Sequence, residues 1–205
     1  MWEQSYPSEL LMRAVEEFSS LPGVGRKSAL RLALHLLKQP EENVERFANA
    51  FIALRRGVKY CRVCHMISDD GMCSVCSDPG RDKSVICVVE SIRDVLSIEN
   101  TERYRGTYHV LGGIISPMDG VGPDDLPIAE LVERAKNESV REVILALSTS
   151  MEGETTSFFL YKKLQECGVQ ITAIARGVGF GDDLEYTDEL TLGKSIENRQ
   201  AFKLN

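Results

Sequence analysis

Apolar residues recur at two different spacings along the 205-residue chain. In the first sixty residues they recur every three to four positions, which is typical of amphipathic helices. This spacing predicts three helices, at residues 7–19, 26–37 and 44–52. A glycine-rich turn separates the first two, and the second ends before Pro40. The N-terminal part of the chain is therefore expected to be entirely helical.

After residue 80, short apolar runs alternate with helical patterns. Strands are predicted at 85–90, 107–113, 142–147 and 169–175. Helices are predicted between and after them, at 91–100, 128–136, 153–167 and near 188–198. Parallel strands need long crossover connections, which are usually helices. The alternation therefore predicts βαβ units and a largely parallel sheet.

The charge is distributed unevenly. The whole chain carries −7, but residues 26–62 hold nine Lys and Arg against three Asp and Glu. This asymmetry indicates an anion-binding segment, with a patchy solvated surface as the alternative. No apolar run approaches the roughly 18 residues of a membrane span, and the first thirty residues lack a signal-peptide pattern. A cytoplasmic protein with no membrane partner is therefore expected.

Four of the six cysteines form a cluster: Cys61, Cys64, Cys73 and Cys76. Two CxxC pairs at this spacing can place four thiolates around one tetrahedral ion. Four thiolates fill the coordination of zinc and leave no open position for water. The cluster therefore predicts one structural Zn²⁺. Redox-active CxxC pairs and unrelated core cysteines are the alternatives.

The stretch LPGVGRKSALRLALHLL joins two predicted helices through a glycine turn. Glycines let the backbone approach a phosphate closely, and the N–H groups and positive dipole at a helix start attract anions. Lys27 and Arg31 are four residues apart and share one helix face. The stretch predicts a helix-hairpin-helix that binds the DNA backbone without reading bases, and an ordinary helical hairpin is the alternative. The residues expected to contact DNA are Gly23, Gly25, Arg26, Lys27, Arg31, Arg55 and Arg56.

A third motif lies where two predicted strands end. Glu90 ends the first predicted strand of the α/β part, and STSMEG, residues 148–153, follows a later one. In Toprim domains, the metal-binding fold of topoisomerases and primases, a glutamate and a D-x-D-x-x-G motif at these places hold Mg²⁺. Gly153 is in place, but serine stands at both aspartate positions, and a hydroxyl is a poor Mg²⁺ ligand. The stretch therefore resembles a Toprim site with its acids removed.

The order of these motifs resembles the RecR family of bacterial recombination mediators over essentially the whole chain. CRVCHMISDDGMCSVC, VVESIRDVLSIE, EGETTSFFLYKKL and GVGFGDDLEYTDELTLGKSIENR are similar to the corresponding family segments. The resemblance implies a multidomain α and α/β protein: a helical N-terminal domain, a four-cysteine zinc finger, a Toprim-like domain and a C-terminal segment, at 1–56, 57–79, 80–176 and 177–205. Many relatives have an Asn-Pro-Thr-like turn at residues 148–150, and neither form supplies the acids.

The resemblance also implies a function. RecR proteins have no established catalytic activity and assemble into ring-like tetramers that can encircle DNA. They act with RecO and RecF to load RecA at single-strand gaps, in the bacterial cytoplasm at the nucleoid. Lys27 and Arg31 resemble the family's DNA contacts, and the face carrying Glu90 and Asp94 resembles the surface offered to RecO.

Two other functions stay open on the residues alone. A Mg²⁺-dependent Toprim nuclease or primase-like enzyme would use Glu90 with Glu152 or Asp119, and the missing aspartates argue against it. A zinc-ribbon module that binds only protein would show no DNA binding that depends on Lys27 and Arg31.

Overall fold

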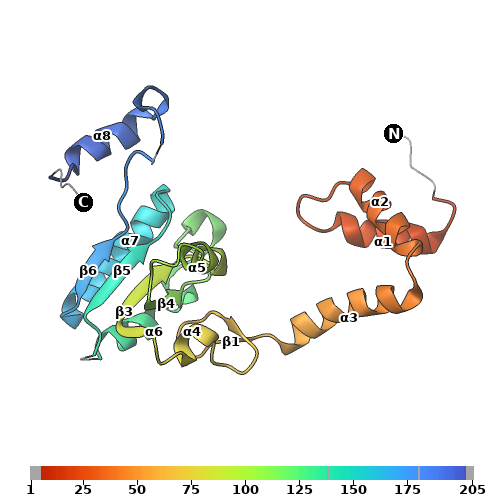
Figure 1. Ribbon diagram of the computed structural model, residues 1–205, viewed down its shortest axis with the longest axis horizontal. Helices are drawn as coiled ribbons and strands as arrows, with labels where there is room; N and C mark the ends of the chain where they lie inside the picture. The colour runs from red at the N-terminus through yellow and green to blue at the C-terminus, as the bar shows by residue number, and fades with distance from the viewer. Residues whose placement is uncertain (1–5, 138, 180, 202–205) are drawn as a thin grey trace. The chain divides into compact units, whose positions relative to one another are not determined.

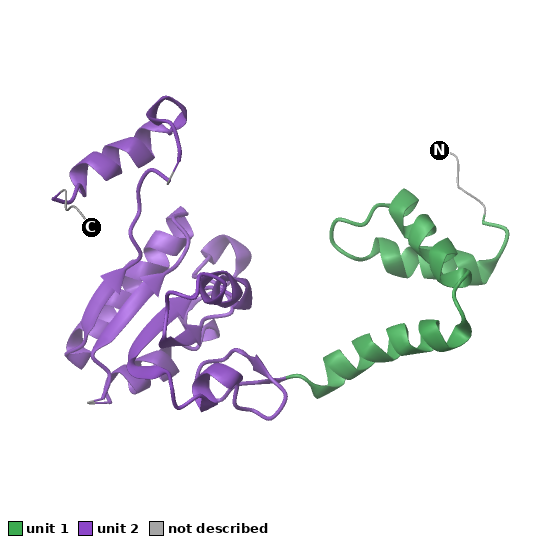
Figure 2. Cartoon of the chain, viewed as in Figure 1, with its two compact units in different colours: residues 1–58 green, residues 59–205 purple. Residues whose placement is uncertain are grey.

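The structure, a computed structural model, describes residues 6–137, 139–179 and 181–201. The chain forms two compact units, residues 1–58 and residues 59–205 (Figure 2). The four-cysteine segment lies in the same unit as the α/β part. Within the described ranges, no helix has both the length and the apolar character that crossing a bilayer requires.

The first unit contains the three predicted helices, α1 (Glu9–Ser19), α2 (Arg26–Leu37) and α3 (Glu41–Gly57). The hydroxyl of Ser8 accepts a hydrogen bond from the backbone N–H of Leu11, 3.5 Å away, and caps α1. A small core joins α1 and α2 through Val15, Ala29 and Ala33. No residue of α3 is buried by the described part of the chain, so this helix contributes nothing to that core.

The second unit begins with the cysteine segment. Two short antiparallel strands, β1 (Lys59–Tyr60) and β2 (Ile67–Ser68), are followed by the one-turn helix α4 (Ser74–Ser77). The sequence pattern predicted none of these three elements, because each is too short to show a period. We call residues 59–78 the cysteine module.

The rest of the second unit is built on one sheet of four parallel strands (Figure 1). The strands are β3 (Asp82–Val89), β4 (Gly106–Val110), β5 (Glu142–Ala146) and β6 (Gln170–Ala173), in the spatial order β4-β3-β5-β6. The helices that follow the first three are α5 (Ile92–Glu99), α6 (Ile128–Ala135) and α7 (Met151–Leu164). The predicted βαβ organisation and parallel sheet are confirmed.

Alternation along β3 divides the second unit into two cores. Ile86 and Val88 point to the face covered by α6 and α7. Cys87 and Val89 point to the other face, where they meet α5 and the four clustered cysteines. Because successive side chains of a strand point to opposite faces, the cysteine module shares its core with one face of the sheet.

The predicted element boundaries shift at several ends. Helix α7 begins at Met151, before the predicted start at Gly153, because the Ser150 hydroxyl accepts from the Gly153 N–H at 3.0 Å and caps the helix. Strand β4 ends at Val110, before the predicted end at residue 113. Near the C-terminus, α8 (Glu189–Glu197) confirms the last predicted helix, and Asp188 caps it.

Candidate metal centre and nucleic-acid interface

The four clustered cysteines converge on one point. Cys61 and Cys64 lie in the turn between β1 and β2, Cys73 caps α4, and Cys76 lies within that helix. All four are buried, and their sulfur atoms lie within 4.8 Å of one another. Four sulfurs at a Zn–S distance of about 2.3 Å would stand about 3.8 Å apart around a tetrahedral ion. The arrangement therefore fits zinc without a change of fold.

Backbone N–H groups around the cysteines oppose the effect of burial on the thiols, but they outweigh it only at Cys61, and burial raises the pKa of Cys73 to about 11. The Cys73 sulfur accepts a hydrogen bond from the Cys76 N–H at 3.4 Å. Burial raises the pKa of the Cys61 thiol, but backbone N–H groups at Cys73, Cys64 and Val63 outweigh it and lower that pKa to about 6. The pKa of Cys64 is raised by its hydrogen bond with Cys76 and by burial. A divalent cation at the centre supplies the positive charge that lets all four thiols ionise.

The helical hairpin presents an uncovered helix start. Gly23 adopts a φ of +79°, which favours glycine, and Gly25 occupies the N-cap of α2. No side chain caps the described N-terminus of α2, and its first turn contains no acidic residue. The first backbone N–H groups of α2 therefore have no side-chain acceptor among the described residues. The exposed residues Arg26 and Lys27 lie in the same turn. This end of α2 can therefore accept an anion.

One face of α2 carries further basic side chains. A groove of about 560 Å³ runs along the helix and is lined by Lys27, Ser28, Leu30, Arg31, Leu34, His35 and Lys38. The sequence predicted Lys27 and Arg31 as DNA contacts, and His35 and Lys38, which line the same groove, were not among the residues predicted. The signal was present, because the helical spacing that joins Lys27 to Arg31 reaches His35 four residues later. Arg55 and Arg56 are exposed in the last turn of α3, where they also complement the helix dipole.

Glu90 follows β3 and Asp94 lies in the first turn of α5, so both stand at the junction of these two elements. The Asp94 carboxylate accepts hydrogen bonds from the Ser91 N–H at 2.7 Å and from the Ser91 hydroxyl at 3.0 Å. These bonds stabilise the start of α5. Asp94 is thus held by its own helix, whereas Glu90 is half-buried at the strand end.

The serines at the two Toprim acid positions hydrogen-bond to each other. The hydroxyls of Ser148 and Ser150 are 2.9 Å apart, and Ser150 also caps α7. Glu154, in the first turn of α7, forms an ion pair with Arg176, which follows β6. Among the described residues, the four cysteines are the one group of three or more His, Cys, Asp or Glu that could hold a metal ion. After β5 the two former acid positions therefore present hydroxyls and the nearby Glu154 carboxylate is paired, while Glu90 after β3 is the acid of the Toprim pattern that the chain retains.

Comparison with protein families matches this arrangement piece by piece. A model of the RecR helix-hairpin-helix matches residues 11–54, and a model of the RecR four-cysteine zinc finger domain matches residues 58–78. A Toprim domain model matches residues 84–175, and a RecR C-terminal model matches residues 177–200. The matches follow one another along nearly the whole chain.

Relatives that match over nearly their whole length belong to the same family as these domain models. "Recombination protein RecR" of Porphyromonas gingivalis strain ATCC 33277 is 61% identical over 199 residues, which are 97% of this chain and 96% of that protein. The chain belongs to the RecR family. The RecR proteins of Bacteroides thetaiotaomicron, at 60% identity over 97% of each chain, and Cytophaga hutchinsonii, at 52% over 97% of this chain and 98% of that protein, are further relatives. All three are named as recombination proteins and none as an enzyme.

The family match settles the role of the cysteines. The RecR zinc-finger match encloses all four, and their sulfurs already stand at distances that suit a tetrahedral ion. This RecR-family chain therefore has one structural zinc site, formed by Cys61, Cys64, Cys73 and Cys76. No fifth position is available for a reacting water, because four thiolates complete the coordination.

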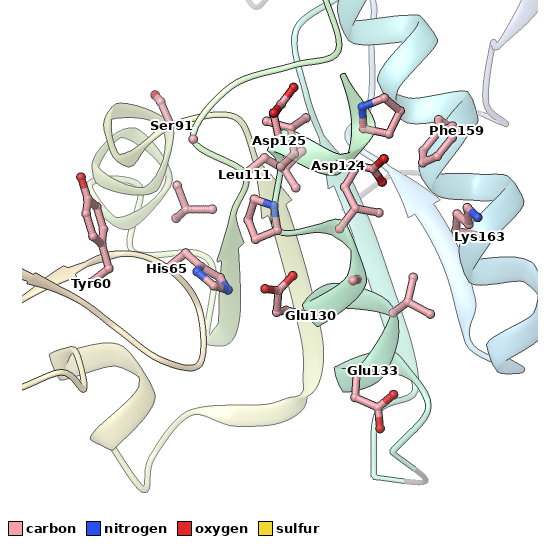
Figure 3. Close-up of a pocket in the computed structure, with 18 of the residues that line it drawn as sticks. Tyr60, His65, Ser91, Leu111, Asp124, Asp125, Glu130, Glu133, Phe159 and Lys163 are labelled. Carbon is pink, nitrogen blue, oxygen red and sulfur yellow. The ribbon is translucent and has the colours of Figure 1, made fainter. Parts of the chain in front are cut away.

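The structure also contains a cavity that the RecR motifs did not reveal. It has a volume of about 1110 Å³ and extends along α6, with Ser91 and Leu111 at the carboxyl ends of β3 and β4, His65 of the cysteine module and Lys163 of α7 also in its wall (Figure 3). Its wall carries four carboxylates, Asp124, Asp125, Glu130 and Glu133. All four belong to the loop and helix after β4, and only folding brings them to one cavity with Ser91 and His65.

Proposed function

We propose that this RecR-family protein is a DNA-binding recombination mediator without catalytic activity. It acts with RecO and RecF in loading RecA at single-strand gaps, as a ring-like clamp. The observation that carries the proposal is the exposed basic face of α2, which follows an uncapped helix start. Backbone N–H groups and lysine or arginine side chains at such a place bind phosphates without reading bases. The expected DNA contacts are Gly23, Gly25, Arg26, Lys27, Arg31, Arg55 and Arg56, with His35 and Lys38 added from the groove.

Helix α3 supports self-association. None of its 17 residues is buried by the described part of the chain, and four large apolar side chains are between 42% and 57% exposed: Phe47, Phe51, Ile52 and Leu54. An amphipathic helix with an uncovered apolar face needs a partner surface. The partner proposed is a second copy of this chain, and a tetramer is the expected assembly. Several hairpins in one ring would strengthen weak phosphate contacts by avidity.

The residues that follow β3 and β5 support a binding role in place of catalysis. Ser148 and Ser150 replace the metal-binding acids and hydrogen-bond to each other. Glu154 is neutralised by Arg176. Glu90 and Asp94 are proposed as part of the face that meets RecO. Because the Asp94 carboxylate is already engaged by Ser91, we expect Glu90 to contribute more to that contact.

The experiment is a binding titration with a labelled gapped duplex at several salt concentrations. The Lys27→Ala/Arg31→Ala variant is compared with wild type, and Arg103→Ala/Lys136→Ala serves as a control that removes the same charge from exposed positions of the other unit. Wild-type binding should weaken steeply with salt. The hairpin variant should bind more weakly, and its slope of log affinity against log salt should be smaller by about 2.

The control and the cleavage assay distinguish the alternatives. Equal weakening in both variants would assign the effect to net charge and contradict the hairpin interface. Cleaved DNA in the presence of Mg²⁺ would contradict a non-enzymatic role and favour a Toprim nuclease. Absence of binding by wild type, also after addition of RecO, would contradict DNA binding and favour a protein-only zinc module.

A further inference from the structure

The guanidinium of Arg134 connects two segments that are far apart in the sequence. Arg134 lies in the last turn of α6. One of its terminal nitrogens donates to the backbone carbonyl of Val63, at 3.2 Å, and to that of Tyr108, at 2.8 Å. The other donates to the hydroxyl of Thr107 at 3.2 Å. Val63 stands between the zinc ligands Cys61 and Cys64, so a single side chain bonds both the first CxxC turn and β4.

These bonds lie at the free edge of the sheet. Strand β4 is the outermost strand on its side, so the outward N–H and C=O groups of Tyr108 and Val110 have no neighbouring strand among the described residues. Arg134 donates to the Tyr108 carbonyl, and the Val110 N–H donates to the Cys64 carbonyl at 2.8 Å. The cysteine module and Arg134 together cover an edge that would otherwise expose unpaired backbone groups.

The charge of Arg134 suits its position. One Zn²⁺ with four thiolates carries a net charge of −2, and a buried charge is costly unless an opposite charge is near. Burial lowers the pKa of the Arg134 guanidinium, whereas attraction to Cys76, Cys64 and Cys61 acts in the opposite direction. The half-buried guanidinium is therefore stabilised in its charged form by the nearby thiolates, and it supplies a positive charge close to the zinc centre.

A histidine fixes the orientation of the guanidinium. The Nε2–H of His109 donates to the Pro127 carbonyl at 2.8 Å, so Nδ1 is an acceptor, and it lies 3.4 Å from the Arg134 nitrogen that also donates to Val63 and Tyr108. This longest contact shares an N–H with one of those carbonyls. A planar fork with several donors can serve acceptors on β4, on the cysteine module and on His109 together. A lysine would keep the charge and lose most of these bonds.

We propose that Arg134 is the positioning residue of the zinc centre. Its guanidinium compensates the charge of the zinc tetrathiolate and fastens the first CxxC turn to the edge of the Toprim sheet. Zinc occupancy and the order of the β4 edge are therefore coupled. Loss of zinc lowers the protection of the β4 amides, and loss of the Arg134 side chain speeds the release of zinc.

The first test measures the rate of zinc release to a chromophoric chelator. Arg134→Met removes charge and donors, Arg134→Gln keeps donors without charge, and Arg134→Lys keeps charge with a single donor group. Substitution of a residue that orients metal ligands typically lowers metal affinity by about 10- to 100-fold. We expect release to be at least about tenfold faster in the Met and Gln variants, with the Lys variant between them and wild type.

The matched control is Arg141→Met, which removes an arginine whose side chain is 73% exposed and which pairs with Asp82. It should release zinc at the wild-type rate. Wild-type release from Arg134→Met, or a Lys variant as fast as the Gln variant, would overturn the proposal. So would equally fast release from the Arg141 control, because a general loss of stability would then explain both.

The second test uses the wild-type protein and does not depend on how the variants fold. Amide hydrogen exchange is compared before and after zinc removal by a chelator. The Val110 amide and the C-terminal turn of α6 should exchange faster without zinc, while the amides of β5, in the middle of the sheet, keep their protection. Unchanged exchange at Val110, or an equal loss at β5, would contradict a local coupling through Arg134.

Discussion

His109 shows how one buried side chain makes the fold sensitive to pH. The residue is fully buried in β4, where its ring lies between the Pro127 carbonyl, Arg134 and the ring of His65. Burial lowers its pKa to about 3, and the nearby positive charge of Arg134 acts in the same direction. His109 is therefore neutral in the folded protein well below the pH at which a free histidine gains a proton.

The sign of the effect follows from this pKa. Between pH 6.5, the ordinary histidine value, and pH 3, the unfolded chain binds a proton at His109 and the folded chain does not. Stability must therefore decrease as pH falls through this window. At pH 5 the contribution amounts to about 2 kcal/mol, since each pKa unit is worth about 1.4 kcal/mol.

We expect His109→Gln to reduce this acid sensitivity. Denaturant unfolding at pH 7.5 and pH 5.0 gives the loss of stability on acidification for each protein. The variant should be less stable than wild type at pH 7.5, because it disturbs the bonds to Pro127 and Arg134. Its further loss at pH 5.0 should be smaller by about 2 kcal/mol. An equal loss in both proteins would place the acid sensitivity elsewhere.

Gly153 shows what remains of a metal motif when the metal ligands are gone. A Cβ at this position would lie 2.2 Å from the Ser148 carbonyl oxygen. The glycine is thus required by the close approach of α7 to the strand end, whether or not acids occupy the neighbouring positions. The motif glycine therefore indicates the Toprim fold, and only the acids would indicate catalysis.

At the scale of elements, α3 differs from the other long helices because none of its residues is buried in the described structure. Its first turn carries Glu41 and Glu42 and its last turn Arg55 and Arg56, so both ends complement the dipole. The rings of Phe47 and Phe51 touch edge to face, with centroids 4.9 Å apart, on a surface that no other described part of the chain buries. The helix is well formed locally and has no buried residue within the described part of its own unit, residues 6–58.

Substitution of Phe47 and Phe51 by serine should lower the oligomeric mass. The change removes apolar surface from a face that we propose lies against a second copy, and each ring contributes most of its stabilisation through such burial. Sedimentation at a fixed protein concentration measures the result. The control Glu42→Ser/Glu45→Ser alters the polar residues of the same helix and should leave the mass unchanged. A wild-type mass in the phenylalanine variant would contradict the α3 interface.

At the scale of the whole molecule, the zinc centre is part of the second unit rather than an appendage to it. The four cysteines share one core with Cys87, Val89, Val95, Tyr108 and Val110. The hairpin core, by contrast, is formed by Val15, Ala29 and Ala33. The consequences of zinc loss should therefore differ between the two units.

Cys61→Ser should destabilise the cysteine module and the adjoining β4 edge and spare the hairpin. Loss of a ligand weakens the zinc site and removes folding free energy that the metal supplies. Limited proteolysis with mass spectrometry, compared with wild type and with the Cys167→Ser control outside the centre, measures the protection of each unit. Early cleavage in the cysteine module and β4, with an intact hairpin, is expected. Soluble, fully protected variant protein without zinc would contradict a structural role.

Much of this architecture could be predicted from the sequence because the information was local. Two CxxC pairs, a glycine turn between helices and alternating apolar runs each fall within a short window, and each was confirmed. Element ends were less accurate, as at α7, because one hydroxyl from Ser150 decides where the helix begins. The domain boundaries and the individual DNA and partner contacts stay predictions.

The sequence by itself determined the order of the parts, the identity of the metal ligands and the absence of aspartates at positions 148 and 150. Only the tertiary structure decided which distant groups meet. It joined Arg134 to the first CxxC turn, paired Glu154 with Arg176, buried His109, and gathered four carboxylates around one cavity. The physical reason is that these contacts depend on the edge of β4 and on the packing of α6 and α7. Such long-range pairings leave no periodic signal in the chain.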